Sequence, residues 1–159
     1  MIVGIDNGLD GGCVSISKHS GDVISKMVMP VKERAGKREV DVKKIYSWVM
    51  DHNTPFELAI EEPLHHARSS QAVRSMALSF GKILGMAESR DWDISCVSVR
   101  KWQSVLLGKF IPKGQTKVRA LEVANELVPG ECWLKSKRAK KPHDGLIDAF
   151  LIARFLRGM

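Results

Sequence analysis

The chain has 159 residues, enough for one hydrophobic core, and we expect a single domain over residues 1–159. Lysine and arginine number 25 against 18 aspartate and glutamate residues, a formal net charge of +7 that is typical of proteins with a polyanionic partner. The three cysteines are odd in number and lack metal-ligand spacing, which argues against a zinc domain and a disulfide-stapled domain. No apolar run approaches the roughly 18–20 residues of a membrane span, which argues against a membrane protein. We therefore expect a cytoplasmic protein.

The first half of the sequence predicts a three-stranded meander, a helix and a central strand. MIVGID is an apolar run ending at Asp6, and the turn signal Asn7-Gly8 separates it from GCVSISK, the expected returning strand. VISKMVMPV predicts the third strand, and the charged segment Lys32–Glu39 predicts a loop. DVKKIYSWVMDH has apolar residues at helical spacing, and FELAIEEP predicts a buried strand that ends at Pro63.

The second half predicts a long helix from Ser70 to about Ser89, the strand WDISCVSV and the short helix RKWQSVLLG. After the loop GKFIPKGQ, Thr116 is the expected cap of the next helix, and a basic loop leads to a last helix in HDGLIDAFLIARF. This order predicts an α/β fold with a mixed five-stranded sheet, a three-strand antiparallel meander followed by two parallel strands, flanked by helices.

The last predicted helix carries two acidic residues, Asp144 and Asp148, four positions apart in an apolar stretch. Residues at this spacing lie on one face of a helix, where two like charges repel each other. Asp144 follows Pro142 by two residues, so an N-cap role is an alternative explanation for it. Asp148 has no such local explanation, since a carboxylate among apolar side chains needs a cation or a metal ion to offset its burial.

Two further carboxylates end predicted strands that we expect to lie near one edge of the sheet, where sites are usually built. We therefore expect four acids to meet there: Asp6, Glu61, Asp144 and Asp148. Glu62 competes with Glu61 for this place, because neighbouring strand residues face opposite sides of a sheet. Two Mg²⁺ ions, roughly 3.5–4 Å apart, would offset the repulsion, one orienting water and the other stabilising a leaving 3′ oxygen. We expect Mn²⁺ to substitute for Mg²⁺.

GIDNG with Asp6, AIEEP with Glu61 and HDGLIDAFLIA with Asp144 and Asp148 resemble, in this order, the acidic motifs of the RuvC-like Holliday junction resolvases. The resemblance covers nearly the whole chain. It implies an RNase H-like fold, the four acids as catalytic metal ligands, and nicks in branched DNA with 5′-phosphate and 3′-hydroxyl ends. The best-known bacterial members space the last two acids by three residues, and the spacing of four is closer to phage-type relatives. Lys117 resembles a basic residue that the family uses near the scissile phosphate.

The same resemblance implies a homodimer that binds a four-way junction. The helix Ser70–Ser89 is rich in small residues, which is consistent both with a helix-to-helix dimer contact and with tight packing on the sheet. For His143 three roles stay open: a metal ligand, a proton donor or a surface residue without a catalytic role. The residues expected to contact DNA are His65, His66, Arg68, Arg74, Lys113, Lys117, Lys137 and Arg138.

Three other functions stay open at this stage. A different RNase H-like nuclease, such as a flap or RNA-processing enzyme of the YqgF type, would use the same acids on another substrate. An actin-like or sugar-kinase ATPase has a phosphate-binding hairpin that resembles VGIDNG. Such an ATPase, however, needs two lobes to hold ATP, and it would have no use for Asp144 and Asp148. A non-catalytic DNA-binding module would have no use for four acids.

Overall fold

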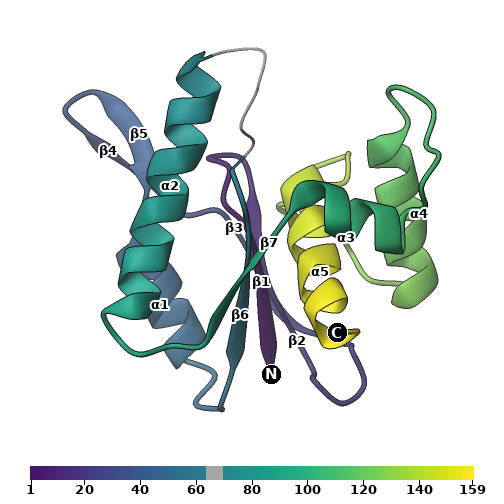
Figure 1. The fold of residues 1–159 in the computed structure, drawn as a ribbon, viewed down its shortest axis with the longest axis horizontal. Helices are drawn as coiled ribbons and strands as arrows, with labels where there is room; N and C mark the ends of the chain where they lie inside the picture. The colour runs from purple at the N-terminus through teal and green to yellow at the C-terminus, as the bar shows by residue number, and fades with distance from the viewer. Residues whose placement is uncertain (64–69) are drawn as a thin grey trace.

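The structure, a computed structural model, describes every residue except 64–69. Its main sheet has five strands in the order β3-β2-β1-β6-β7 (Figure 1). β1 pairs antiparallel with β2 and β2 with β3, whereas β6 runs parallel to β1 and β7 parallel to β6. The predicted mixed sheet is confirmed, with strands β1 (Ile2–Asp6), β2 (Gly12–Ile16), β3 (Val23–Val28), β6 (Glu57–Glu61) and β7 (Ile94–Val97).

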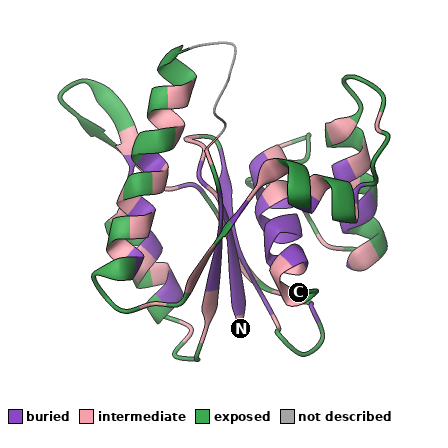
Figure 2. Ribbon diagram, viewed as in Figure 1, coloured by how far each residue is buried: buried purple, intermediate pink, exposed green. Residues whose placement is uncertain are grey.

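Helices cover both faces of this sheet (Figure 1). On one face lie α1 (Val42–Met50) and α2 (Ser70–Glu88), and on the other lie α3 (Val99–Leu106), α4 (Thr116–Leu127) and α5 (Asp144–Arg157). Each face has its own apolar core, and the central strands β1, β2 and β6 between them are almost wholly buried (Figure 2). Parallel strands need this cover on both sides, because both of their faces are apolar.

The helix α5 packs unusually close to the sheet, because glycines remove side chains at the contact. A Cβ on Gly4 of β1 would overlap the carbonyl oxygen of Ala149, and a Cβ on Gly145 would overlap the backbone of Gly11 in the β1–β2 turn. Glycine is therefore required at both places for the two backbones to approach. The result is that the first turn of α5 lies directly against the turn that follows Asp6.

The segment Lys32–Glu39, predicted as a loop, belongs instead to a two-stranded sheet of β4 (Val31–Arg34) and β5 (Lys37–Val40). Ala35 and Gly36 both have positive φ, 50° and 70°, as a two-residue type I′ hairpin turn requires. The turn could not be predicted from the sequence, because the first turn position holds alanine, a residue with no preference for positive φ. The hairpin lies beside α2 (Figure 1).

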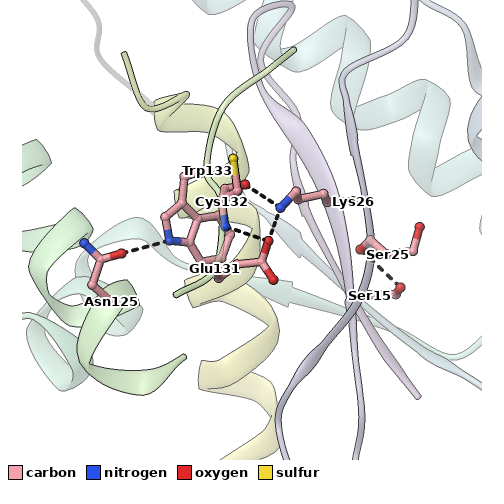
Figure 3. Close-up of polar contacts among 7 residues, drawn as sticks. All are labelled: Ser15, Ser25, Lys26, Asn125, Glu131, Cys132 and Trp133. Carbon is pink, nitrogen blue, oxygen red and sulfur yellow. Dashed lines mark hydrogen bonds and ion pairs between the residues drawn. The ribbon is translucent and has the colours of Figure 1, made fainter. Parts of the chain in front are cut away.

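The segment between α4 and α5 is anchored by side chains from β3 and α4 (Figure 3). Lys26 of β3 donates to the Glu131 carboxylate and to the Cys132 carbonyl, and Trp133 donates to the Asn125 side chain at 3.2 Å. Leu134 and Pro142 then form an isolated bridge, so the basic residues between them form a loop with a closed base. No helix in the part of the chain that the structure describes is both long enough and apolar enough to cross a membrane.

Candidate active site

Asp6 ends β1 and lies at the centre of the acidic residues. Its Oδ1 accepts a hydrogen bond of 3.0 Å from the amide of Gly8, which orients the carboxylate. The next residue, Asn7, is fully buried, and its amide nitrogen donates to the Glu61 carbonyl. This bond ties the end of β1 to the end of β6. The other side-chain atom of Asn7, Oδ1, is buried and has no hydrogen-bond partner among the described residues.

Glu61 points into the molecule and Glu62 points out. Glu61 is 9% exposed and its Oε1 accepts a hydrogen bond of 2.8 Å from the indole nitrogen of Trp102, which is fully buried in α3. Glu62 is exposed. The alternation of side chains along β6 therefore directs Glu61, and not Glu62, towards Asp6 and α5. Trp102 could not be predicted as a partner of Glu61 from the sequence, because a polar contact over 41 residues leaves no local signal.

The start of α5 differs from the sequence expectation. His143 is the N-cap residue, and its Nδ1 accepts from the Leu146 amide at 3.3 Å. The N-cap alternative for Asp144 is therefore wrong: Asp144 is the first helical residue, where a negative charge interacts favourably with the helix dipole. Since Nδ1 accepts, a neutral His143 carries its proton on Nε2.

Lys117 forms an ion pair with Asp144, and both side chains are substantially exposed. The pair connects the start of α4 to the start of α5. Thr116 does not cap α4 as we expected, because Gln115 precedes the helix without any side-chain cap bond and Thr116 is already helical. Hydrogen bonding to the Asp144 carboxylate is the main cause that raises the pKa of Lys117 above its usual range, so Lys117 carries a positive charge beside the acids.

Burial and mutual repulsion disfavour negative charge on the three inner acids. Desolvation raises the pKa of Glu61 to about 8, with further contributions from the charges of Asp6 and Asp148. The pKa of Asp148 rises to about 7, first through burial and then through Asp6 and Asp144. Burial also raises the pKa of Asp6, although the Gly8 amide opposes it. Three carboxyl groups from three segments thus share one electrostatic environment, and a bound cation would stabilise all of them.

The residues fit a divalent cation in chemical type. Carboxylate and amide oxygens are the ligands that Mg²⁺ prefers, and the unpartnered Asn7 oxygen is buried next to Asp6. Within the described residues, however, no three His, Cys, Asp or Glu side chains stand close enough to form a ready-made metal site. Asp144 is bonded to Lys117 and Glu61 to Trp102, so full convergence requires at least the first of these contacts to open.

The residues expected to contact DNA fall on several segments. Lys113 is exposed in the α3–α4 loop, and Lys137 and Arg138 are exposed in the loop closed by the Leu134–Pro142 bridge, just before His143. Arg74 is exposed on α2, next to the β4–β5 hairpin. The remaining candidates, His65, His66 and Arg68, lie outside the described residues.

Comparison with solved structures relates this arrangement to known proteins. A Thermus thermophilus RuvC in complex with a Holliday junction substrate matches with a TM-score of 0.62 and 18% identity, over 97% of this chain and 90% of that chain. The fold is that of RuvC. A second Thermus thermophilus RuvC structure matches with a TM-score of 0.55 and 17% identity, over 97% of this chain and 91% of that one. No protein-family model and no curated protein matches the sequence.

The likeness to RuvC covers the β-meander, the two parallel strands and the covering helices, and it identifies the architecture as RNase H-like. At 17–18% identity it concerns the fold, so the chemistry must be argued from this chain's own residues.

Proposed function

We propose that this protein is a structure-selective endodeoxyribonuclease that resolves Holliday junctions and related branched DNA, cutting phosphodiester bonds to leave 5′-phosphate and 3′-hydroxyl ends. The single observation that carries the proposal is that Asp6, Glu61 and Asp148, from β1, β6 and α5, lie near enough in one partly buried environment for the charge of Asp6 to raise the pKa of the other two. A structural protein gains nothing from that arrangement, whereas a metal-dependent nuclease needs it. The RuvC fold supports the choice of branched DNA as substrate.

Asp6, Glu61, Asp144 and Asp148 would hold two Mg²⁺ ions, or Mn²⁺ in their place. When bound, such ions supply Lewis-acid stabilisation of the phosphodiester oxygens and a more acidic water. The chain's own residues do the rest. Trp102 holds one oxygen of Glu61 and leaves the other available, and the Gly8 amide does the same for Asp6.

Lys117 has two roles in this proposal. In the free protein it neutralises Asp144 and keeps that carboxylate away from the three inner acids. When DNA arrives, the scissile phosphate competes for the ammonium group, since a phosphate oxygen is an equally good partner for a lysine. Release of Asp144 then completes the acidic set next to the phosphate that Lys117 binds.

A homodimer fits this substrate, because two symmetric cuts need two active sites. On the outer side of α2, Ala77, Gly81 and Gly85 are exposed, and a Cβ at either glycine would meet nothing within 4 Å. That surface permits a second helix to approach closely. We propose α2 as the dimer contact, with Lys113, Lys137 and Arg138 contacting DNA near the acids.

The test uses purified protein and labelled DNA in three forms: a four-way junction, a Y-fork and a linear duplex, each with Mg²⁺ and with EDTA. Paired symmetric nicks in the junction alone, and only with Mg²⁺, would support the proposal. Comparable cutting of the fork or the duplex would replace it with a general structure-selective nuclease. Junction binding without cleavage in Mg²⁺ or Mn²⁺ would contradict a catalytic role for the acids.

A further inference from the structure

The β4–β5 hairpin and α2 enclose a groove of about 670 Å³ on the side of the acidic residues away from α4. Five cationic side chains and a single carboxylate line it: Arg34, Lys37, Arg38, Arg74, Lys82 and Glu39. A charge excess of this kind in a concave surface attracts a polyanion. We infer that this groove, which we call the hairpin groove, binds the phosphodiester backbone of a DNA duplex arm. The inference rests on the proposed function and adds a second DNA contact to it.

The single carboxylate of the groove is already neutralised within the protein. Glu39 accepts a hydrogen bond from Lys82 of α2, and Lys32 of β4 lies 3.8 Å from its other oxygen. Hydrogen bonding to Lys82 is the main cause that lowers the pKa of Glu39, with Lys32 and Arg34 adding to it. The ion pair fastens the hairpin to α2, so the groove has two fixed walls.

Three of the other cations of the groove remain available to a ligand. In the described part of the chain, no ion pair or side-chain hydrogen bond involves Arg34, Lys37 or Arg74, and all three residues are exposed. Arg34 and Lys37 pair across the hairpin two residues along the strands from the pair Lys32–Glu39, and they therefore lie on the same face, the α2 side. Unpaired arginines and lysines on facing walls suit phosphate oxygens, which accept bonds from both.

The hairpin is also connected to the acidic residues. Arg38 donates to Asp10 at 3.3 Å, and Asp10 lies in the turn that follows Asp6. This contact places Arg38, one residue pair from the turn of the hairpin, beside the turn that follows Asp6 in the candidate active site. A duplex arm that leaves the acids on this side would run along the groove.

A second copy of this chain is a poor occupant, because it would bring the same positive charges against the five that line the groove. An acidic peptide would match the charge but has no reason to lie beside a nuclease site. DNA matches the positive charge of the groove and, as the proposed substrate, also lies beside the nuclease site. The dimer surface proposed on α2 extends along the exposed Gly81 and Gly85, which do not line the groove, and meets the groove at Ala77.

The experiment measures binding of a fluorescent four-way junction and of a linear duplex by anisotropy, in EDTA to prevent cleavage, over 50–200 mM salt. The test variant is Lys37→Gln with Arg74→Gln, one cation from each wall. The matched control is Lys18→Gln with Arg90→Gln, which also removes one lysine and one arginine. Its residues lie at the opposite end of the sheet, in the β2–β3 turn and after the end of α2 (Figure 1). Thermal unfolding checks that each variant folds.

We expect the test variant to bind the junction about tenfold more weakly than the control, with a salt dependence of log K shallower by about 1.8, that is about 0.9 for each lost phosphate contact. Lys37→Arg should bind like the wild type, since it keeps the charge. Equal affinity and equal salt dependence in test and control variants would overturn the inference, and would leave an acidic peptide as the better occupant.

The outcome is separable from that of the proposed function. A wild-type protein that binds DNA through the groove but cuts no junction would refute the nuclease and leave the groove. A protein that cuts junctions while the groove variant binds and cuts normally would refute the groove and leave the nuclease.

Discussion

Replacing Glu61 with glutamine should stabilise the metal-free protein at pH 8 and abolish cleavage. The folded state holds the pKa of Glu61 at about 8, against 4.5 for an unperturbed glutamate. Between these two values the folded protein binds a proton that the unfolded chain has released. Wild-type stability therefore falls as pH rises through this window. Glutamine cannot ionise, keeps an oxygen that accepts from Trp102, and so removes the cost.

The magnitude follows from the same values. One pKa unit corresponds to about 1.4 kcal/mol. Part of the raised pKa comes from the charges of Asp6 and Asp148, so this part of the free energy belongs to the three acids together. The free energy of unfolding gained by Glu61→Gln at pH 8 is therefore on the order of 2–4 kcal/mol. For a chain of this size that is a rise in Tm of roughly 5–12 °C. At pH 5, where Glu61 is protonated in the folded state, the gain should be small.

The assay is thermal unfolding in EDTA from pH 5 to pH 8.5, repeated with Mg²⁺. The matched control is Glu62→Gln, whose carboxylate is exposed, and its Tm should follow the wild type at every pH. Mg²⁺ should raise the Tm of the wild type at pH 8 more than that of Glu61→Gln. A Glu61→Gln protein that is no more stable than the wild type at pH 8, or equally shifted at all pH values, would refute the reasoning.

Four further predictions concern single contacts. Asp6→Asn and Asp148→Asn should each abolish cleavage in a junction nicking assay, while junction binding stays within a few-fold of wild type. The control Glu62→Gln should cut normally. Near-normal cutting by either aspartate variant would show that the residue is not part of the site. Trp102→Phe loses the bond to Glu61, so we expect a cleavage rate lower by about 10–100-fold with junction binding retained, and an unchanged rate would show that the bond does not matter. Gly145→Ala forces a Cβ into the Gly11 backbone and should cost about 1–3 kcal/mol in urea unfolding, whereas Gly158→Ala, whose Cβ would meet no atom closer than 3.6 Å, should cost little. Ala35→Asn, at a φ of 50°, should stabilise the hairpin by about 0.5–1 kcal/mol in the same unfolding measurement, and a loss of stability would argue against the type I′ turn.

Periodic and terminating signals made most of the fold predictable. The strands β1 and β6 have continuous apolar runs, each bounded by a turn signal or proline, and β2 alternates. The helices α1 and α2 have apolar residues at helical spacing. The β4–β5 hairpin was missed because its strands are charged and its turn begins with Ala35. The N-cap alternative for Asp144 is wrong because His143, an uncommon N-cap residue, takes that place.

Asp6, Glu61 and Asp148 could be picked out from the sequence alone, because Asp6 and Glu61 end apolar strands and Asp148 interrupts an apolar helix, where a carboxylate is costly. Their arrangement in space follows from tertiary packing. The glycine contact between α5 and the β1–β2 turn brings Asp148 into the electrostatic environment of Asp6. The pleat of β6 selects Glu61 over Glu62, and Lys117 forms an ion pair with Asp144. These relations depend on distances between segments far apart in the chain, and local residue patterns carry no information on such distances.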